Sequence, residues 1–192
     1  MSQLKNTFNP PADEAPVIKT GPQVLIFLDM DDVLTRWTDY AEKTIGHVPP
    51  EKRQEHYHTL GEDWWASIPA FDGARDFYDS LSARGPVRFL TGVKLEPGVY
   101  SGKARWIMNF IPEKGREILR SFMPVSSRDK QLLAGPGRIL VDDRVKNIEE
   151  WRKAGGIGIL HTGNYAESIS KVDDAISQMH ARVKADGPDP GV

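Results

Sequence analysis

The chain has 192 residues, of which 39% are hydrophobic and 27% are charged, and its formal net charge is −2. This length suits one globular domain with a small insertion, and the weak net charge argues against a nucleic acid polymer as partner. The lack of cysteine excludes disulfides, thiolate nucleophiles and zinc–thiolate sites.

Residues 1–22 are polar and rich in proline, and we expect them to form a flexible leader. They lack the apolar core of a secretion signal, and no later apolar run approaches membrane-spanning length. We therefore expect a soluble, cytoplasmic protein with no membrane partner, and the formation of a homodimer is left open.

The first strand is predicted at Val24–Leu28, where five consecutive apolar residues run directly into acids. Such a run fits a strand buried on both faces, as in a parallel sheet flanked by helices. A helical, aromatic-rich stretch follows from Thr35 to Ile68, and Pro49-Pro50-Glu51 has the pattern of a helix start within it.

Helices and strands alternate along the rest of the chain. Further strands are predicted at Val87–Leu90, Ser121–Val125, Arg138–Val141 and Ile157–Leu160. Helices are predicted around Ala74–Leu81, Lys103–Ile111, Ile148–Ala154 and Ile169–Val183, and the tail 184–192 is expected to be frayed. This alternation predicts an α/β fold with a doubly wound parallel sheet.

Three of the predicted strands end in polar groups, and parallel neighbours would bring these ends to one edge of the sheet. Open α/β sheets bind their ligands at this edge. Clustered acids repel one another unless a cation or hydrogen-bond donors compensate. The groups concerned are Asp29 and Asp31, Thr91 and Gly92, and Asp142 and Asp143.

These residue types fit phosphoryl transfer. An aspartate beside a divalent cation can attack phosphorus and form an acyl-phosphate that water later cleaves. A second acid can protonate the leaving oxygen and then activate the water. Magnesium prefers oxygen ligands, and a hydroxyl, backbone amides and a lysine would surround the phosphoryl oxygens.

From Gln23 to Thr162 the chain resembles the haloacid dehalogenase (HAD) superfamily of phosphatases, and within it the 5′(3′)-deoxyribonucleotidase-like group. The resemblance implies a HAD-like Rossmannoid core at 23–34 and 70–183, with a small helical cap at 35–69 that selects the substrate. The motifs that carry it are Asp29-Met30-Asp31, Thr91-Gly92, Ser127-Arg128-Asp129-Lys130 and Ile139–Arg144.

The resemblance implies a role for each matched catalytic residue. Asp29 would be the nucleophile, and Asp31 would be the acid and base. Thr91 and Gly92 would hold the transferring phosphoryl group, and Lys130 would neutralise its charge. Lys103 is the alternative catalytic lysine if the match at Lys130 misleads.

The same motifs imply a magnesium site formed by Asp29, Asp31, Asp142 and Asp143. Asp143 is the favoured direct ligand, with Asp142 holding metal-bound water, although the two are not firmly separated. The chain departs from the family at Asp32, where a small residue, often glycine, is usual. This extra carboxylate would either point into solvent or alter the affinity for metal.

The aromatic residues of the predicted cap point to the substrate. Trp37, Trp64 and Trp65 occupy positions like those of base-contacting aromatics in the deoxyribonucleotidase group, and aromatic rings let nucleobases stack. We expect one of Trp64 and Trp65 to face the site and the other to pack. Arg128 and Lys94 are candidates for binding the phosphate or the base.

The sequence is therefore interpreted as that of a magnesium-dependent phosphatase that acts through an aspartyl-phosphate on a (deoxy)nucleoside 5′-monophosphate. One alternative is a phosphatase for a sugar phosphate or another small phosphomonoester, since only the cap would differ. A second alternative is a non-catalytic binding module with the same fold, and Asp32 is the only residue in its favour.

Overall fold

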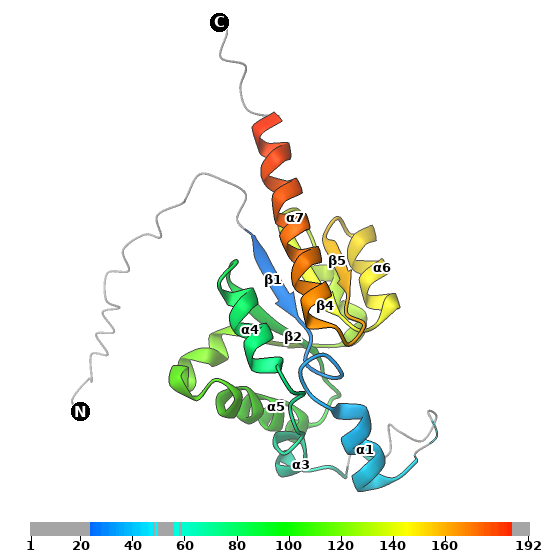
Figure 1. Ribbon diagram of the computed structural model, residues 1–192. Coiled ribbons are helices and arrows are strands. Elements are labelled where there is room, and N and C mark those ends of the chain that lie inside the picture. The colour runs from blue at the N-terminus through cyan, green and yellow to red at the C-terminus, as the bar shows by residue number, and fades with distance from the viewer. Residues whose placement is uncertain (1–23, 48, 50–55, 58, 186–192) are drawn as a thin grey trace, which may run out of the picture.

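The computed structural model describes residues 24–47, 49, 56–57 and 59–185, and for 183–185 only the backbone (Figure 1). The predicted leader 1–22, the helix start at Pro50 and residues 186–192 of the predicted tail lie outside this part of the chain. Residues 184 and 185, which were expected to be frayed, belong to the last helix. No helix within the described residues is both long and apolar enough to cross a lipid bilayer.

Five parallel strands form one sheet in the order β3-β2-β1-β4-β5. This confirms the predicted α/β fold with a doubly wound parallel sheet. The strands are β1 (Leu25–Leu28), β2 (Val87–Gly92), β3 (Phe122–Val125), β4 (Arg138–Asp142) and β5 (Ile157–Leu160).

The α-helices are α1 (Trp37–Ile45), α3 (Glu62–Ala66), α4 (Ala74–Ser82), α5 (Pro97–Phe110), α6 (Val145–Lys153) and α7 (Tyr165–Ala185). The prediction that α5 begins at Lys103 was wrong, because the helix begins at Pro97. Proline has no backbone N–H, and in the first turn of a helix this group would have no partner within the helix. Two 3₁₀-helices, η1 (Pro112–Ser121) and η2 (Ser127–Leu133), were not predicted.

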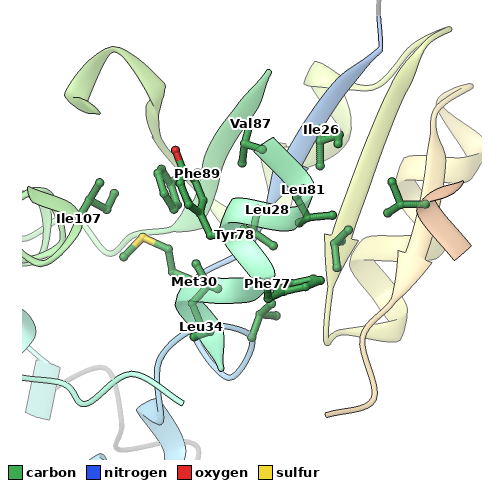
Figure 2. Close-up of a cluster of buried hydrophobic side chains, with 14 of the residues drawn as sticks. Ile26, Leu28, Met30, Leu34, Phe77, Tyr78, Leu81, Val87, Phe89 and Ile107 are labelled. Atoms are coloured by element: carbon green, nitrogen blue, oxygen red, sulfur yellow. The ribbon is translucent and has the colours of Figure 1, made fainter. Parts of the chain in front are cut away.

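The two faces of the sheet are covered by different helices. Ile26 and Leu28 of β1 pack against α4 and α7 on one face, while Phe27 packs against Trp151 of α6 on the other. Figure 2 shows the first of these layers, where Phe77, Tyr78 and Leu81 of α4 gather over the sheet. Because successive side chains of a strand point to opposite faces, both faces of β1 are apolar, and the strand is buried from Ile26 to Leu28.

The topology places two acidic strand ends side by side. The chain proceeds from β1 outward to β2 and β3 and then returns to β4 on the other side of β1, so the order reverses between β1 and β4. Leu28 pairs with Val141, and the Asp29 amide donates to the Val141 carbonyl at 3.0 Å. Asp29 and Asp142 therefore meet at the carboxyl ends of neighbouring strands, where open α/β sheets bind ligands.

The segment that contains α1 and α3 leaves and rejoins the rest of the chain at one place. Thr35 and Ala70 form an antiparallel bridge, and the Arg36 amide donates to the Pro69 carbonyl at 2.8 Å. α1 and α3 lie beyond the carboxyl end of β1 (Figure 1). This segment therefore lies at the edge of the sheet where the acids end, and its role as a cap stays a prediction.

α3 packs closely on α5, and a glycine makes this approach possible. A Cβ atom at Gly102 would lie 2.4 Å from the Cβ of Trp65 and 2.7 Å from the Glu62 carbonyl oxygen. Such distances are too short for any side chain, so the two helices meet at their backbones here. This contact fixes Trp65 against α5.

We predict that Gly102→Ala lowers the free energy of unfolding by about 2 kcal/mol, because the new methyl group overpacks the contact between α3 and α5 at a cost near the upper end of about 1–3 kcal/mol. This steric cost exceeds the gain of about 1 kcal/mol that alanine brings to a helix interior. Urea unfolding followed by circular dichroism measures the change. Ser101→Ala, at the exposed neighbouring position, is the control and should stay within about 0.5 kcal/mol of the wild type. Equal midpoints for the two variants would contradict the overpacking argument.

Candidate functional site

The site begins with Asp29, directly after β1. Its side chain is buried, and Oδ1 accepts the Met30 amide at 2.8 Å and lies 2.9 Å from Lys130 Nζ. Burial raises the pKa of Asp29 to about 8, and the charges of Asp142 and Asp31 add to this rise while Lys130 opposes it. Both contacts fall on Oδ1, so Oδ2 is the oxygen available to a substrate.

Lys130 and Asp142 form the second buried part of the site. Lys130 Nζ lies 2.7 Å from Asp142 Oδ2, so one ammonium bridges the acids at the ends of β1 and β4. Asp142 also accepts from Asn147 Nδ2 at 3.0 and 2.9 Å and from the Arg144 amide at 2.9 Å. The two acids raise the pKa of Lys130 against the opposing effect of burial, which keeps this lysine charged.

The second lysine also lies in the site. Lys103 is buried on α5, and its Nζ donates to Asp31 Oδ2 at 2.6 Å, to Thr91 Oγ1 at 2.7 Å and to the Gly92 carbonyl at 3.0 Å. An ammonium has three N–H donors, so these bonds use all of them. Lys103 therefore fixes the positions of Asp31 and Thr91.

Three acids are placed so that they could hold a metal ion. One carboxylate oxygen each from Asp29, Asp142 and Asp143 lies within 4.8 Å of the others. Burial, followed by the charges of Asp142 and Asp32, raises the pKa of Asp143 to about 6. The Asp31 side chain, also predicted as a ligand, lies outside this group and bonds to Lys103.

This donor set fits a hard divalent cation. All the donors are oxygens, as magnesium prefers. Acidic side chains outnumber lysines here, and a cation would offset the repulsion that raises the pKa of Asp29 and of Asp143. Both oxygens of Asp142 already accept hydrogen bonds, so the half-buried Asp143 offers the freer carboxylate.

Gly92 joins β2 to the segment that carries Lys130. A Cβ atom at this position would lie 2.3 Å from Ser127 Oγ, so any side chain here would displace the hydroxyl at the start of η2. Arg128 and Lys94, predicted to bind substrate, are both exposed. Lys94 Nζ lies 5.9 Å from the centre of the Tyr57 ring, while Arg128 takes no part in the buried network of lysines and acids.

The aromatic side chains of the α1–α3 segment form a continuous cluster beside the lysine network. Trp65 is buried, and its ring centre lies 5.6 Å from Lys103 Nζ and 6.0 Å from the Tyr57 ring. The centre of the Tyr57 ring in turn lies 5.9 Å from that of the Trp37 ring. Trp64 instead donates to Thr44 Oγ1 at 2.9 Å, so Trp65 is the member of the pair nearer to the acids.

Asp32 neither points into solvent nor joins the acidic group that could bind metal. Its backbone has φ +56°, the only positive φ of a residue other than glycine in the described chain. Its carboxylate accepts from the Thr38 amide at 2.9 Å and from Thr38 Oγ1 at 2.6 Å. Asp32 thus ties the loop after β1 to the first turn of α1.

The sequence analysis did not identify Asn147 as a site residue, and it named Lys103 only as the alternative catalytic lysine. Asn147 lies on the buried face of α6 beside Ile148 and Trp151, so a polar residue on an apolar face was the available signal. Lys103 shares the buried face of α5 with Trp106 and Ile107, at a spacing of three and four residues. This pattern indicates a buried lysine, and buried lysines need acidic partners.

No protein-family profile and no curated protein sequence matches the chain. Among solved structures, a haloacid dehalogenase-like family hydrolase from Xanthomonas campestris has a TM-score of 0.56 at 13% identity, over 88% of this chain and 96% of that one. A HAD-superfamily hydrolase from Ehrlichia chaffeensis has a TM-score of 0.44 at 13% identity, over 82% of this chain and 100% of that one. At these identities the likeness concerns the fold alone, and the chain has the HAD-like Rossmannoid fold.

Proposed function

We propose that this protein is a HAD-superfamily phosphatase of the 5′(3′)-deoxyribonucleotidase-like group, which hydrolyses (deoxy)nucleoside 5′-monophosphates with magnesium. The observation that carries the proposal is the meeting of Asp29, Asp142 and Asp143 around Lys130 at the carboxyl edge of the sheet. A structural ion pair needs only one acid for each lysine. Here two buried carboxylates and one half-buried carboxylate lie together beside one lysine, and this surplus of acids is explained if they hold a cation.

Asp29, Asp142 and Asp143 would hold the magnesium ion, with Asp143 as the freer ligand. The bound ion would neutralise the acids and draw the substrate phosphate towards Asp29. Asn147 and the Arg144 amide orient Asp142, because both donate to its carboxylate.

Asp29 is the proposed nucleophile. Its Oδ2 would form a bond to phosphorus as the bond from phosphorus to the nucleoside O5′ breaks, which leaves an aspartyl-phosphate. Two of the three N–H donors of Lys130 contact acids, so the third is available to a phosphoryl oxygen. Lys103 donates to the Thr91 oxygen, which leaves the Thr91 hydroxyl hydrogen for a second phosphoryl oxygen.

Asp31 is the proposed acid and base. Its Oδ1 is buried and has no hydrogen-bond partner among the described residues, while Oδ2 is held by Lys103. Oδ1 would give a proton to the departing O5′ and then take one from the water that attacks phosphorus. That attack breaks the bond between phosphorus and Asp29 and releases inorganic phosphate.

The aromatic cluster supports a nucleotide as the substrate. Trp37 and Trp65 each have a buried indole N–H without an acceptor in the described chain. Leaving such a donor unpaired costs about 1–3 kcal/mol, which a carbonyl or ring nitrogen of a base would recover. The cluster lies beside Lys103, so a phosphate at Thr91 would place an attached nucleoside near these rings.

Replacing the nucleophile tests the chemistry. We predict that Asp29→Asn lowers phosphate release at least about 10³-fold, because the amide cannot attack phosphorus. Release of inorganic phosphate with and without EDTA is the measurement, and circular dichroism checks the fold. Asp129→Asn, at an exposed acid of η2, should keep wild-type activity. Substantial turnover by the Asp29 variant would refute the assignment.

Magnesium should stabilise the fold independently of any substrate. At a concentration of 100 times its Kd, a ligand that binds only the folded state adds about 2.7 kcal/mol to the free energy of unfolding. We therefore expect the thermal midpoint to rise with magnesium, and to rise less in Asp143→Asn. Glu149→Gln, at an exposed acid of α6, should respond like the wild type. An unchanged midpoint in the wild type would count against the metal site.

A substrate panel separates the nucleotide hypothesis from the sugar-phosphate alternative. Stacking on aromatic rings contributes about 1–3 kcal/mol per base, so we predict that kcat/KM for nucleoside monophosphates exceeds that for sugar phosphates by about tenfold or more. Initial rates of phosphate release over a range of substrate concentrations measure the ratio. Equal values for the two classes would exclude base recognition by the cluster.

A further inference from the structure

Asp32 occupies an unusual backbone conformation next to the catalytic loop. Its φ of +56° lies in the left-handed region, which disfavours side chains with a Cβ atom and favours glycine. A carboxylate retained in this conformation needs a compensating interaction. Its two hydrogen bonds to Thr38, at 2.6 and 2.9 Å, supply it.

These bonds connect two parts of the site, the loop after β1 and the start of α1. Asp32 follows the proposed acid and base Asp31, and its amide donates to the Thr35 carbonyl at 2.9 Å. Thr38 belongs to the first turn of α1, whose first residue is Trp37. The carboxylate therefore fixes the start of α1, and with it the Trp37 ring, relative to the loop that carries the nucleophile.

The other side of the aromatic cluster is fixed by a different contact. Trp65 is held against α5 by the close approach at Gly102, and Lys103 of the same helix bonds to Asp31. Trp37 is not part of that contact. Its ring centre lies 5.9 Å from that of Tyr57, and the side chain packs against the cluster that contains Trp65 and Val99. The bonds between Asp32 and Thr38 add the connection that holds the Trp37 end of α1 to the loop that carries the reacting groups.

We propose that Asp32 is a positioning residue for substrate selection. Through Thr38 it holds the Trp37 ring at the distance from the phosphate site at which the base of a bound nucleotide contacts the ring. This inference rests on the proposed function of the site. It assigns to Asp32 an effect on the binding of substrates that carry a base. Substrates that consist of little more than the phosphoryl group have no base for the Trp37 ring to meet, so the loss of its position leaves them unaffected.

Three variants separate this role from an effect of charge on the neighbouring acids. Asp32→Gly removes the bonds to Thr38 and suits the positive φ. Asp32→Asn also tolerates this φ, and its amide can accept from the Thr38 amide and donate to the hydroxyl, so it keeps the connection without the charge. Thr38→Val removes one of the two bonds and leaves Asp32 in place.

We expect Asp32→Gly to raise KM for a nucleoside monophosphate about tenfold with little change in kcat, and to leave kcat/KM for acetyl phosphate within about twofold of the wild type. Asp32→Asn should resemble the wild type. Thr38→Val should have an intermediate effect, and adding it to Asp32→Gly should cause no further loss, as expected for partners in one interaction.

Hydrogen exchange of the amides of Thr38 to Ala41 gives a readout that needs no turnover. Exchange should be faster in Asp32→Gly and unchanged in Asp32→Asn. Equal losses with both substrates in Asp32→Gly would overturn the proposal, as would losses in Asp32→Asn that match those in Asp32→Gly. If the wild type released phosphate from no substrate, the proposed function would fail, while the exchange rates would still decide whether Asp32 holds α1.

Discussion

The site depends on the burial of several carboxylates around two lysines at the point where the strand order reverses. Asp29 and Asp142 come from strands that are neighbours only because the chain returns across β1, and a single ammonium, that of Lys130, lies between them. Buried charges are costly unless they are paired, and removing one partner of such a group leaves an uncompensated charge. Apolar layers on both faces of β1 surround the strand that leads into this group.

The two lysines have separate tasks. Lys103 donates to three acceptors and has no donor left, so it can orient Asp31 and Thr91 but cannot itself bind a phosphoryl oxygen. Lys130 contacts two acids and keeps one donor. In the proposed function, the saturated lysine would fix the acid and base and the unsaturated lysine would supply a charge to the substrate, which a single lysine could not do in this geometry.

The α1–α3 segment is tied to the core on both sides. Gly102 allows α3 to lie against α5, and Asp32 bonds to the first turn of α1. Each attachment is formed by a residue next to the network of lysines and acids, since Gly102 precedes Lys103 and Asp32 follows Asp31. The aromatic cluster is therefore positioned by the same local structure that positions the acids. In the proposed function, this would link recognition of the substrate to the geometry of the reaction.

The local pattern of apolar and polar residues was enough to predict the order of strands and helices, because each strand is an apolar run followed by polar residues and each helix has a buried face. It also predicted which strand ends carry Asp29, Thr91 and Asp142, since that depends only on where each run ends. Start and end points were less well predicted, as at α5 and the two 3₁₀-helices, because these depend on capping and on packing with distant segments.

The sequence by itself determined the fold class, because this follows from hydrophobic periodicity. It also determined the chemical character of the site, because acids directly follow the buried strands. Only the tertiary structure decided which side chains bond to one another. That Lys103 would meet Asp31, that Asn147 would hold Asp142, and that Asp32 would bond to Thr38 all follow from how segments distant in the chain pack together. A side chain's type limits what it can bind, but its neighbours in space determine what it does bind.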